Sequence, residues 1–396
     1  MPIASRQRYV GFELGNRSLL YVIYAPYWPP YRGDAARIRE FLRLFRSHGW
    51  RVTVAYCNDR THPLLDCRGM ADQADGFYAY FPPADAPQGS PHSIDSWCPP
   101  EFSNMVRAIC AHEHFDVVFA QLVFMSRCLA AVDDTRTLRV LDADNIFAFR
   151  HERFIEAGLP YNWLRPTLEE EAEAWARADL VIAVQENEAD VMRQALPSTP
   201  VLSIPAARDD VQELGTLPDG TELLIVGTDS AQNRAGVTAF IDRALPIIRT
   251  AWPEARLLLA GRVGSGFGDQ GNGIIELGVV EDLIPYYRQA TIVVAPLPAG
   301  TGLIRKSIDA LCFGKCLVAT PGALQGIEGY PEAYVRCETI DEMGPAIVEL
   351  LGDRSRLSAI ADRAFEFAST YFDAPAVFER LETALLAGIE SKERSS

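Results

Sequence analysis

The stretch APLPAGTGLIRKSIDALCFGKCLVAT, residues 295–320, decides the fold. It continues an apolar strand, passes through a turn that contains Gly300 and Gly302, and enters a segment with helical spacing. A second apolar strand, CLVAT, closes the stretch. A strand, a helix and a further strand in this order are typical of a parallel sheet covered by helices. In such sheets, the turn that follows a strand lies at the edge where ligands bind.

This turn and the helix after it combine features that suit a diphosphate. Glycines let a ligand approach the backbone closely, and the N-terminus of a helix directs amide groups and partial positive charge toward an anion. Arg305 and Lys306 add two full positive charges. An ordinary tight turn with solvated basic residues explains the same letters, so composition alone leaves both interpretations open.

The same alternation of apolar strands and amphipathic helices fills the rest of the chain in two sets. The first set of strands is predicted at 18–26, 51–57, 115–122, 138–145 and 178–185, and the second at 222–228, 255–262, 274–278, 291–297, 316–320 and 334–337. Two sets predict an α/β protein of two Rossmann-like domains that face each other across a cleft. The Pro-, Asp- and Gly-rich segment 196–220 marks the join. We therefore expect domains over 1–205 and 206–375, followed by a helix and tail over 376–396.

Composition narrows the class of protein. The chain has 396 residues and a formal net charge of −16, which disfavours nucleic acid as a partner because polyanions require a basic surface. Its 8 Cys are scattered without the spacing of a zinc site, so we expect a reducing compartment rather than a disulfide framework. We find no signal peptide and no apolar run of about 20 residues. The expected location is the cytoplasm, with peripheral contact at the inner face of the membrane left open.

From residue 295 onward the chain resembles glycosyltransferase family 4, the retaining enzymes of the GT-B fold. The segment 225–262 is similar to the first β-α-β unit of that family's second domain, and PPYRGDAARIREFL at 29–42 is similar to the opening of one branch. The resemblance covers most of the chain and is strongest in the C-terminal half. The matching residues of the opening stretch are Pro296, Gly300, Gly302, Lys306, Asp309, Ala310, Gly314 and the strand 318–320.

The chain also departs from the family pattern. The family has two acidic residues with seven between them, and these positions hold Thr301 and Asp309 here. The family often has Arg two residues before the Lys, a place that Ile304 occupies. The usual Arg and Lys of the first loop in the second domain are also missing, and we expect Arg262 and Arg234 as substitutes.

The resemblance implies transfer of a sugar from a nucleotide-sugar donor to a hydroxyl of a glycan, a lipid-linked acceptor or a small molecule. It implies no catalytic metal and no further cofactor, with the acceptor in the first domain and the last helix returning to that domain. Charge stabilisation on the leaving diphosphate falls to cations and the helix N-terminus. The expected catalytic residues are Lys306, Arg262 and Asp144. The expected donor-binding residues are Gly300, Thr301, Gly302, Arg305, Asp309, Gly227, Arg234, Gly33 and Arg32.

Candidates in the first domain are less distinct. Arg32 and Gly33 lie on a loop before a helix, where a surface turn capped by the following Asp is an equal alternative. Asp144 follows a strand and also suits a helix cap. Glu188 follows another strand and either lines the cleft or caps a helix, whereas the run 169–171 is expected on the solvated face of a helix.

Two other functions remain open. A degenerate GT-B protein would bind a nucleotide sugar or a partner without turnover, and the changes at Thr301 and Ile304 motivate this alternative. A GT-B nucleotide-sugar epimerase would need carboxylates and His residues in the cleft, where His151 is the best remaining His. A nicotinamide enzyme fits poorly, because no Gly-x-Gly-x-x-Gly follows the first strand.

Overall fold

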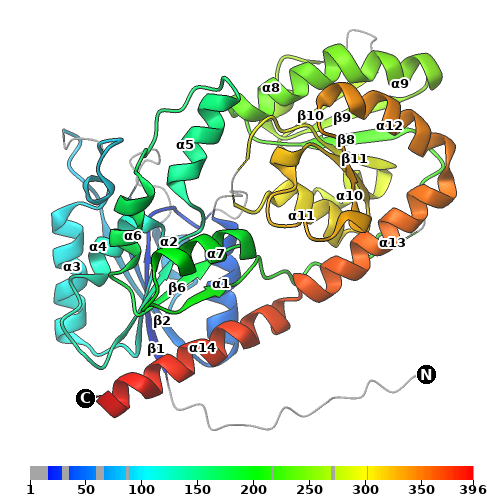
Figure 1. Cartoon of the computed structure of the whole chain (residues 1–396). Helices are drawn as coiled ribbons and strands as arrows, with labels where there is room; N and C mark the ends of the chain where they lie inside the picture. Colours follow the sequence, from blue (N-terminus) through cyan, green and yellow to red (C-terminus); the bar gives the residue numbers. More distant parts are fainter. Residues whose placement is uncertain are drawn as a thin grey trace, which may run out of the picture.

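The protein consists of two α/β domains, each built on one parallel sheet with helices on both faces (Figure 1). The computed structural model describes residues 17–28, 35–58, 67–85, 89–215, 217–268, 273–300 and 302–395. This architecture confirms the prediction of two Rossmann-like domains from the alternation of strands and helices.

The sheet of the first domain has seven strands in the order β3-β2-β1-β4-β5-β6-β7. Its strands are β1 Ser18–Ile23, β2 Arg51–Cys57, β3 Gly76–Tyr80, β4 Val117–Gln121, β5 Leu138–Asp142, β6 Leu180–Ala183 and β7 Val201–Ser203. Its helices are α1 Ala36–Ser47, α2 Cys67–Ala71, α3 Pro100–His112, α4 Ser126–Leu129, α5 Phe147–Glu156, α6 Leu168–Trp175 and α7 Glu186–Ala195. The edge strands β3 and β7 were not predicted, and β7 lies inside the segment that was expected to be only a join.

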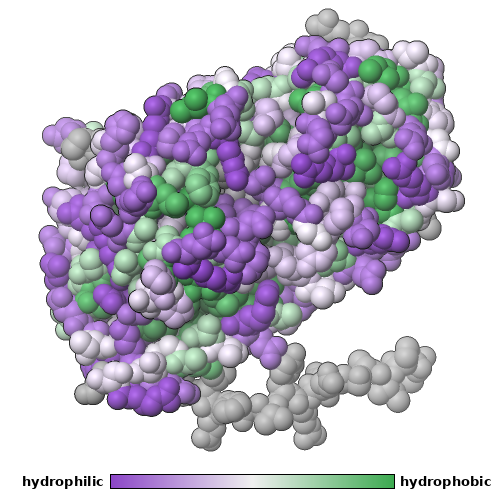
Figure 2. All heavy atoms as spheres, in the orientation of Figure 1, coloured by the Kyte–Doolittle hydropathy of each residue, from purple (hydrophilic) through white to green (hydrophobic). Residues whose placement is uncertain are grey.

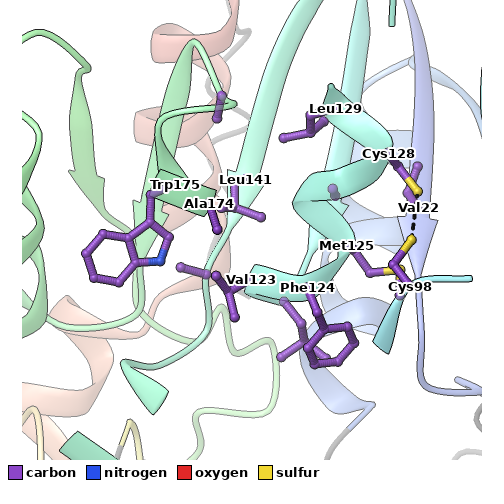
Figure 3. Close-up of a cluster of buried hydrophobic side chains, with 14 of the residues drawn as sticks. Val22, Cys98, Val123, Phe124, Met125, Cys128, Leu129, Leu141, Ala174 and Trp175 are labelled. Carbon is purple, nitrogen blue, oxygen red and sulfur yellow. Dashed lines mark hydrogen bonds between the residues drawn. The ribbon is translucent and has the colours of Figure 1, made fainter. Parts of the chain in front are cut away.

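The strands of this sheet are apolar on both faces because helices cover both. On β1, Leu20 and Val22 pack into one buried cluster, whereas Leu19, Tyr21 and Ile23 pack into the cluster on the opposite face. Figure 3 shows part of the first cluster, in which side chains from β1, β5, α4 and α6 meet. Burial of alternating residues on both faces is the pattern expected of a parallel sheet with two helical layers.

The sheet of the second domain has six strands in the order β10-β9-β8-β11-β12-β13. Its strands are β8 Glu222–Val226, β9 Arg256–Ala260, β10 Ile274–Gly278, β11 Ile292–Ala295, β12 Cys316–Ala319 and β13 Val335–Arg336. Its helices are α8 Ala231–Ala239, α9 Leu245–Ala251, α10 Ile284–Gln289, α11 Arg305–Cys312, α12 Ile340–Gly352 and α13 Arg354–Tyr371.

The chain passes between the domains at two places that lie side by side. The backbone N–H of Arg208 donates to Phe372 O at 2.7 Å, and Ala374 N–H donates back to Arg208 O at 3.2 Å. The last helix, α14 (Ala374–Ser395), then runs along the first domain (Figure 1). Its Phe378 and Leu381 are buried in the same cluster as β1. The two crossings therefore form a paired connection between the domains.

None of the helices in the part of the chain that the structure describes is both long and apolar enough to cross a bilayer. On the face drawn in Figure 2, hydrophilic residues predominate and the hydrophobic ones form small separate groups.

Candidate active site

The turn between β11 and α11, residues 296–304, is shaped by two glycines with different requirements. A Cβ on Gly300 would lie 2.0 Å from the carbonyl oxygen of Gly322, so only glycine fits this close approach. Gly302 has a φ of +65°, a conformation that side chains rarely adopt. We call this segment the donor turn. It packs on the loop that follows β12 and presents its backbone toward the first domain.

Lys306 lies in the first turn of α11, and its side chain reaches across to the start of α8. Its Nζ donates to Asn233 Oδ1 at 2.6 Å, and the Asn233 amide in turn donates to Thr228 O at 3.0 Å. Burial lowers the pKa of the Lys306 ammonium to about 8. Within the described residues no ion pair or further hydrogen bond of this ammonium accompanies the one to Asn233. The site therefore holds a desolvated cation with a neutral partner.

The ends of β8 and β9 also approach closely beside Lys306. A Cβ on Gly261, whose φ is +90°, would lie 2.2 Å from the carbonyl oxygen of Gly227. Likewise a Cβ on Gly236 would lie 1.8 Å from Pro296 O, so α8 packs directly on the backbone after β11. These glycines let three strand ends and two helix starts converge at one edge of the sheet.

The two expected substitute cations differ in what they contact. Arg234 donates to Ser265 O at 2.9 and 3.1 Å and pairs with Asp229 at 2.7 Å, so its guanidinium holds the loop after β9. Arg262 begins the short 3-10 helix Arg262–Gly264 and is exposed. Of these two arginines, only Arg262 has a side chain without a hydrogen-bond or ion-pair partner among the described residues.

Arg305 and Asp309 belong to a chain of charges that joins the domains. Arg305 donates to Glu40 Oε1 of α1 at 2.7 Å and to Asp309 Oδ1 at 3.2 Å. Arg208, at the first crossing between the domains, forms an ion pair with the same oxygen of Asp309 and with Asp210. The Asp309 carboxylate therefore lies between two guanidinium groups. Sequence reasoning missed Glu40 and Arg208, which lie far from Asp309 in the chain.

In the first domain, Asp142 and Asp144 have different surroundings. Asp142 is fully buried and accepts two hydrogen bonds from the Arg37 guanidinium, at 2.8 and 2.9 Å. Asp144 has a φ of +64°, which is uncommon for a residue other than glycine. Burial and the nearby Asp142 charge raise the pKa of Asp144. Strained backbone of this kind gathers at functional sites, which agrees with a site role for Asp144.

The expectation for the run 169–171 was wrong at one position. Glu171 is fully buried, and its carboxylate accepts from the backbone N–H groups of Phe147 at 3.0 Å and Ala148 at 2.7 Å. It therefore satisfies the free amide groups at the start of α5. Burial raises the pKa of Glu171 to about 8. Nothing local in the sequence distinguishes it from its solvated neighbours Glu169 and Glu170.

Several contacts place the first domain against the donor turn. Arg153 of α5 donates to Gly300 O at 3.1 Å and to Gln325 Oε1 at 2.6 Å. Burial raises the pKa of the Glu188 carboxyl group on α7 to about 7, and the nearby backbone N–H of Gly302 opposes that rise. His151, by contrast, packs near Tyr161 with ring centroids 6.3 Å apart.

Three of the predicted site residues, Arg32, Gly33 and Thr301, lie outside the described residues. Among the residues that are described, no group of three or more His, Cys, Asp or Glu side chains is arranged to hold a metal ion.

Comparison with known proteins assigns the second domain and the fold. Residues 220–353 match the family model described as glycosyl transferases group 1. No curated protein matches the chain. The matched residues include the donor turn, Lys306 and Asn233, and the match supports a glycosyltransferase.

Solved structures align with nearly the whole chain at low sequence identity. HepE of Anabaena, in complex with UDP and glucose, is 16% identical with a TM-score of 0.64, over 93% of this chain and 98% of that one. Sucrose-phosphate synthase of Thermosynechococcus elongatus is 14% identical with a TM-score of 0.67, over 94% and 100%. A putative UDP-N-acetylglucosamine 2-epimerase of Listeria monocytogenes is 11% identical with a TM-score of 0.61, over 96% and 98%. The fold is GT-B.

Proposed function

We propose that the protein is a retaining glycosyltransferase of family 4 that transfers a hexose from a nucleotide sugar to an acceptor hydroxyl. The acceptor would be a glycan, a lipid-linked sugar or a small molecule. Polysaccharide assembly in the cytoplasm, at or near the inner face of the membrane, is the setting that the family resemblance suggests. Because HepE forms a complex with UDP-glucose, uridine diphosphate is the first nucleotide to test.

The observation that carries this proposal is the half-buried ammonium of Lys306. Withdrawing a charge from water is costly unless an opposite charge compensates it, and the partner found here, Asn233, is neutral. A diphosphate at this point would provide the missing negative charge. It would also oppose the lowering of the pKa of Lys306 that burial causes.

The start of α11 adds to the same anion site. Ile304 provides no side-chain cap for this helix, so its first amide groups are left for a ligand. Arg262 at the end of β9 is a second cation that is free to approach phosphate oxygens. When the bond between the sugar and the diphosphate breaks, negative charge grows on the leaving oxygen. Lys306, Arg262 and the helix N-terminus would stabilise that charge.

The acceptor would enter from the first domain, where Asp144 follows β5. Closure of the domains over the donor would exclude water and limit hydrolysis of the nucleotide sugar. The paired crossings at Arg208 and Phe372 are the connection about which such closure would occur.

The test is nucleotide binding by wild-type protein and Lys306→Ala, measured by calorimetry with uridine, guanosine, adenosine and thymidine diphosphates. We expect one nucleotide to bind and the variant to lose about 10- to 100-fold in affinity, because a hydrogen-bonded charge pair is removed. Lys392→Ala is the control, since Lys392 pairs with Asp179 in the first domain. Failure of every nucleotide to bind wild-type protein would overturn the proposal in favour of a degenerate GT-B protein that binds a partner.

A nucleotide-sugar epimerase is the second candidate, and one observation favours keeping it. The structure brings two carboxylates with raised pKa values, Asp144 and Glu188, next to the donor turn, where proton transfer would need them. Product analysis separates the two functions. An epimerase converts the nucleotide sugar without an acceptor, whereas a transferase releases the nucleoside diphosphate.

A further inference from the structure

Among the buried acceptor atoms of the first domain that have no hydrogen-bond partner within the described residues, three belong to residues next to the donor turn. They are Asn145 Oδ1, Gln185 Oε1 and Glu188 Oε2. The three residues are only 5%, 2% and 6% exposed. Buried polar atoms are nearly always paired, because leaving one unpaired costs free energy. Three such atoms in one place therefore call for a ligand that donates hydrogen bonds.

These three side chains gather around the donor turn. Asn145 Cβ lies 3.3 Å from the position that a Cβ would take on Gly302, and the Gly302 N–H is near enough to Glu188 to lower the pKa of that carboxyl group. The Gln185 side chain acts on the pKa of Glu188 in the same direction, and its Oε1 lies 2.9 Å from the position of a Cβ on Gly326. Asn145 follows β5, and Gln185 and Glu188 follow β6. The group is thus assembled from neighbouring strand ends of the first domain and faces the second.

The chemistry of the group selects its ligand. Two amide oxygens and one carboxylate oxygen accept hydrogen bonds, so the ligand must present several O–H or N–H groups close together. Phosphate oxygens are acceptors, and the carboxylates of Asp144 and Glu188 would repel them. A metal cation is disfavoured by the positive charge of Arg153, which acts on Glu188, and by the N–H dipole of Gly302 nearby. The ring of a sugar, with hydroxyl groups on adjacent carbons, meets the requirement.

We propose that Asn145, Gln185 and Glu188 form a subsite that binds the hydroxyl groups of a sugar through their unpaired oxygens. This inference rests on the proposed function, because it places the sugar of the nucleotide-sugar donor beside the donor turn. The diphosphate would lie on the cationic side of that turn, at Lys306, and the sugar on the carboxylate side. The sugar of an acceptor presents the same hydroxyl chemistry and is the other source that the experiment must distinguish.

The experiment compares wild-type protein with Glu188→Gln in three binding titrations. The probes are the nucleotide that the screen above selects, starting with UDP, the matching nucleotide sugar, starting with UDP-glucose, and free glucose added to protein saturated with UDP. The matched control is Glu186→Gln, because Glu186 lies two residues away on α7 and pairs with Arg193 at the surface. Asn145→Ala is a second variant that removes a different acceptor of the same group.

We expect Glu188→Gln to bind UDP within about twofold of wild type and UDP-glucose about 10- to 100-fold more weakly, since a hydrogen bond to a charged group is lost. Unchanged UDP affinity also shows that the variant is folded. Asn145→Ala should shift the same titration in the same direction by about 2- to 10-fold. A loss confined to free glucose would support the subsite with the acceptor sugar as its ligand.

Two results would overturn the subsite. One is a Glu188→Gln variant whose titrations with all three probes equal those of wild type. This result would leave the proposed function intact, because UDP would still bind at Lys306. The other is a loss of affinity that appears only with added calcium or magnesium and disappears with a chelator, which would assign the three oxygens to a cation. Wild-type protein that binds no nucleotide contradicts the proposed function and the subsite together.

Discussion

The two domains contribute to their contact in different ways. The second domain supplies a compact cationic half, in which the donor turn, Lys306 and Asn233 come from two short stretches with glycines at fixed places. The first domain supplies an acidic half, with Glu40 on α1, Asp144 after β5 and Glu188 on α7. The cationic half comes from segments that are local in the sequence, whereas the acidic half is assembled from distant segments. Residue patterns predicted the cationic half directly, whereas Asp144 and Glu188 were predicted together with the alternative that they cap helices, and Glu40 was missed.

The largest loss of stability is expected when the buried ion pair between Arg37 and Asp142 is broken. Arg37→Ala leaves the Asp142 carboxylate, which is 0% exposed, without its cation. Removing one partner of a buried pair typically costs about 3–5 kcal/mol, and we expect that loss in the free energy of unfolding. Urea denaturation measures it.

The control for this variant lies on the same helix. Arg46→Ala breaks a surface pair with Asp75, which should cost less than about 1 kcal/mol. Equal stability of the two variants would show that the Arg37 pair does not support the first domain as described.

A smaller effect, on the cationic half, is expected from Gly300→Ala. The added Cβ would lie 2.0 Å from Gly322 O, and both groups belong to backbone that has little freedom to move. Overpacking of this kind costs about 1–3 kcal/mol and should displace the donor turn, which lowers nucleotide affinity about tenfold. Calorimetric titration with the selected nucleotide measures the loss. Gly329→Ala is the matched control, because a Cβ there meets no atom within 4 Å, and similar affinities for both variants would contradict the prediction.

The pH dependence of stability probes the acidic half. Burial raises the pKa of Glu188 to about 7 and that of Glu171 to about 8, from an ordinary value of 4.5. Between the ordinary and the raised pKa, the native state keeps protons that the unfolded state has released, so stability falls as pH rises. We expect the free energy of unfolding to drop by as much as about 6 kcal/mol from pH 5 to pH 8 through these two groups.

Urea denaturation at several pH values tests this dependence. Glu188→Gln should flatten the slope, because its amide does not titrate, and subtraction of the two curves removes the shared contribution of the His residues. A slope that is the same in wild type and variant would show that Glu188 titrates near its ordinary pKa.

The sequence predicted the cationic half more fully than the acidic half, for physical reasons. Gly300 and Gly302 flank a strand-to-helix turn whose geometry restricts the residue type, and Lys306 follows at a short distance. The ion pair between Asp309 and Arg208 could not be predicted, because Arg208 lies at the crossing between the domains, far from Asp309 in the sequence. Glu171 was assigned to a solvated face, since its neighbours are solvated and its role as the cap of α5 depends on a helix elsewhere in the chain.

The strands show the same division between local and distant determinants. Central strands such as β1 and β11 are apolar on both faces and were predicted from composition alone. The edge strand β3 is only half-buried along most of its length, and β7 is a short strand in a Pro-rich segment. Neither carries the continuous apolar run that identifies a covered strand, because an edge position does not require it.

The smallest effect is expected for the ion pair between Glu40 of the first domain and Arg305 of the second. Glu40→Gln removes the carboxylate that accepts from Arg305 across the domains, but Arg305 keeps Asp309 as a partner. The Arg305 side chain is 38% exposed, so solvent screens its charge. We expect the free energy of unfolding to change by less than about 1 kcal/mol and nucleotide affinity to change by less than about twofold. Urea denaturation and calorimetry measure both quantities. A larger change would mean that this ion pair, rather than the contacts of Arg153 and Glu188 with the donor turn, holds the domains together.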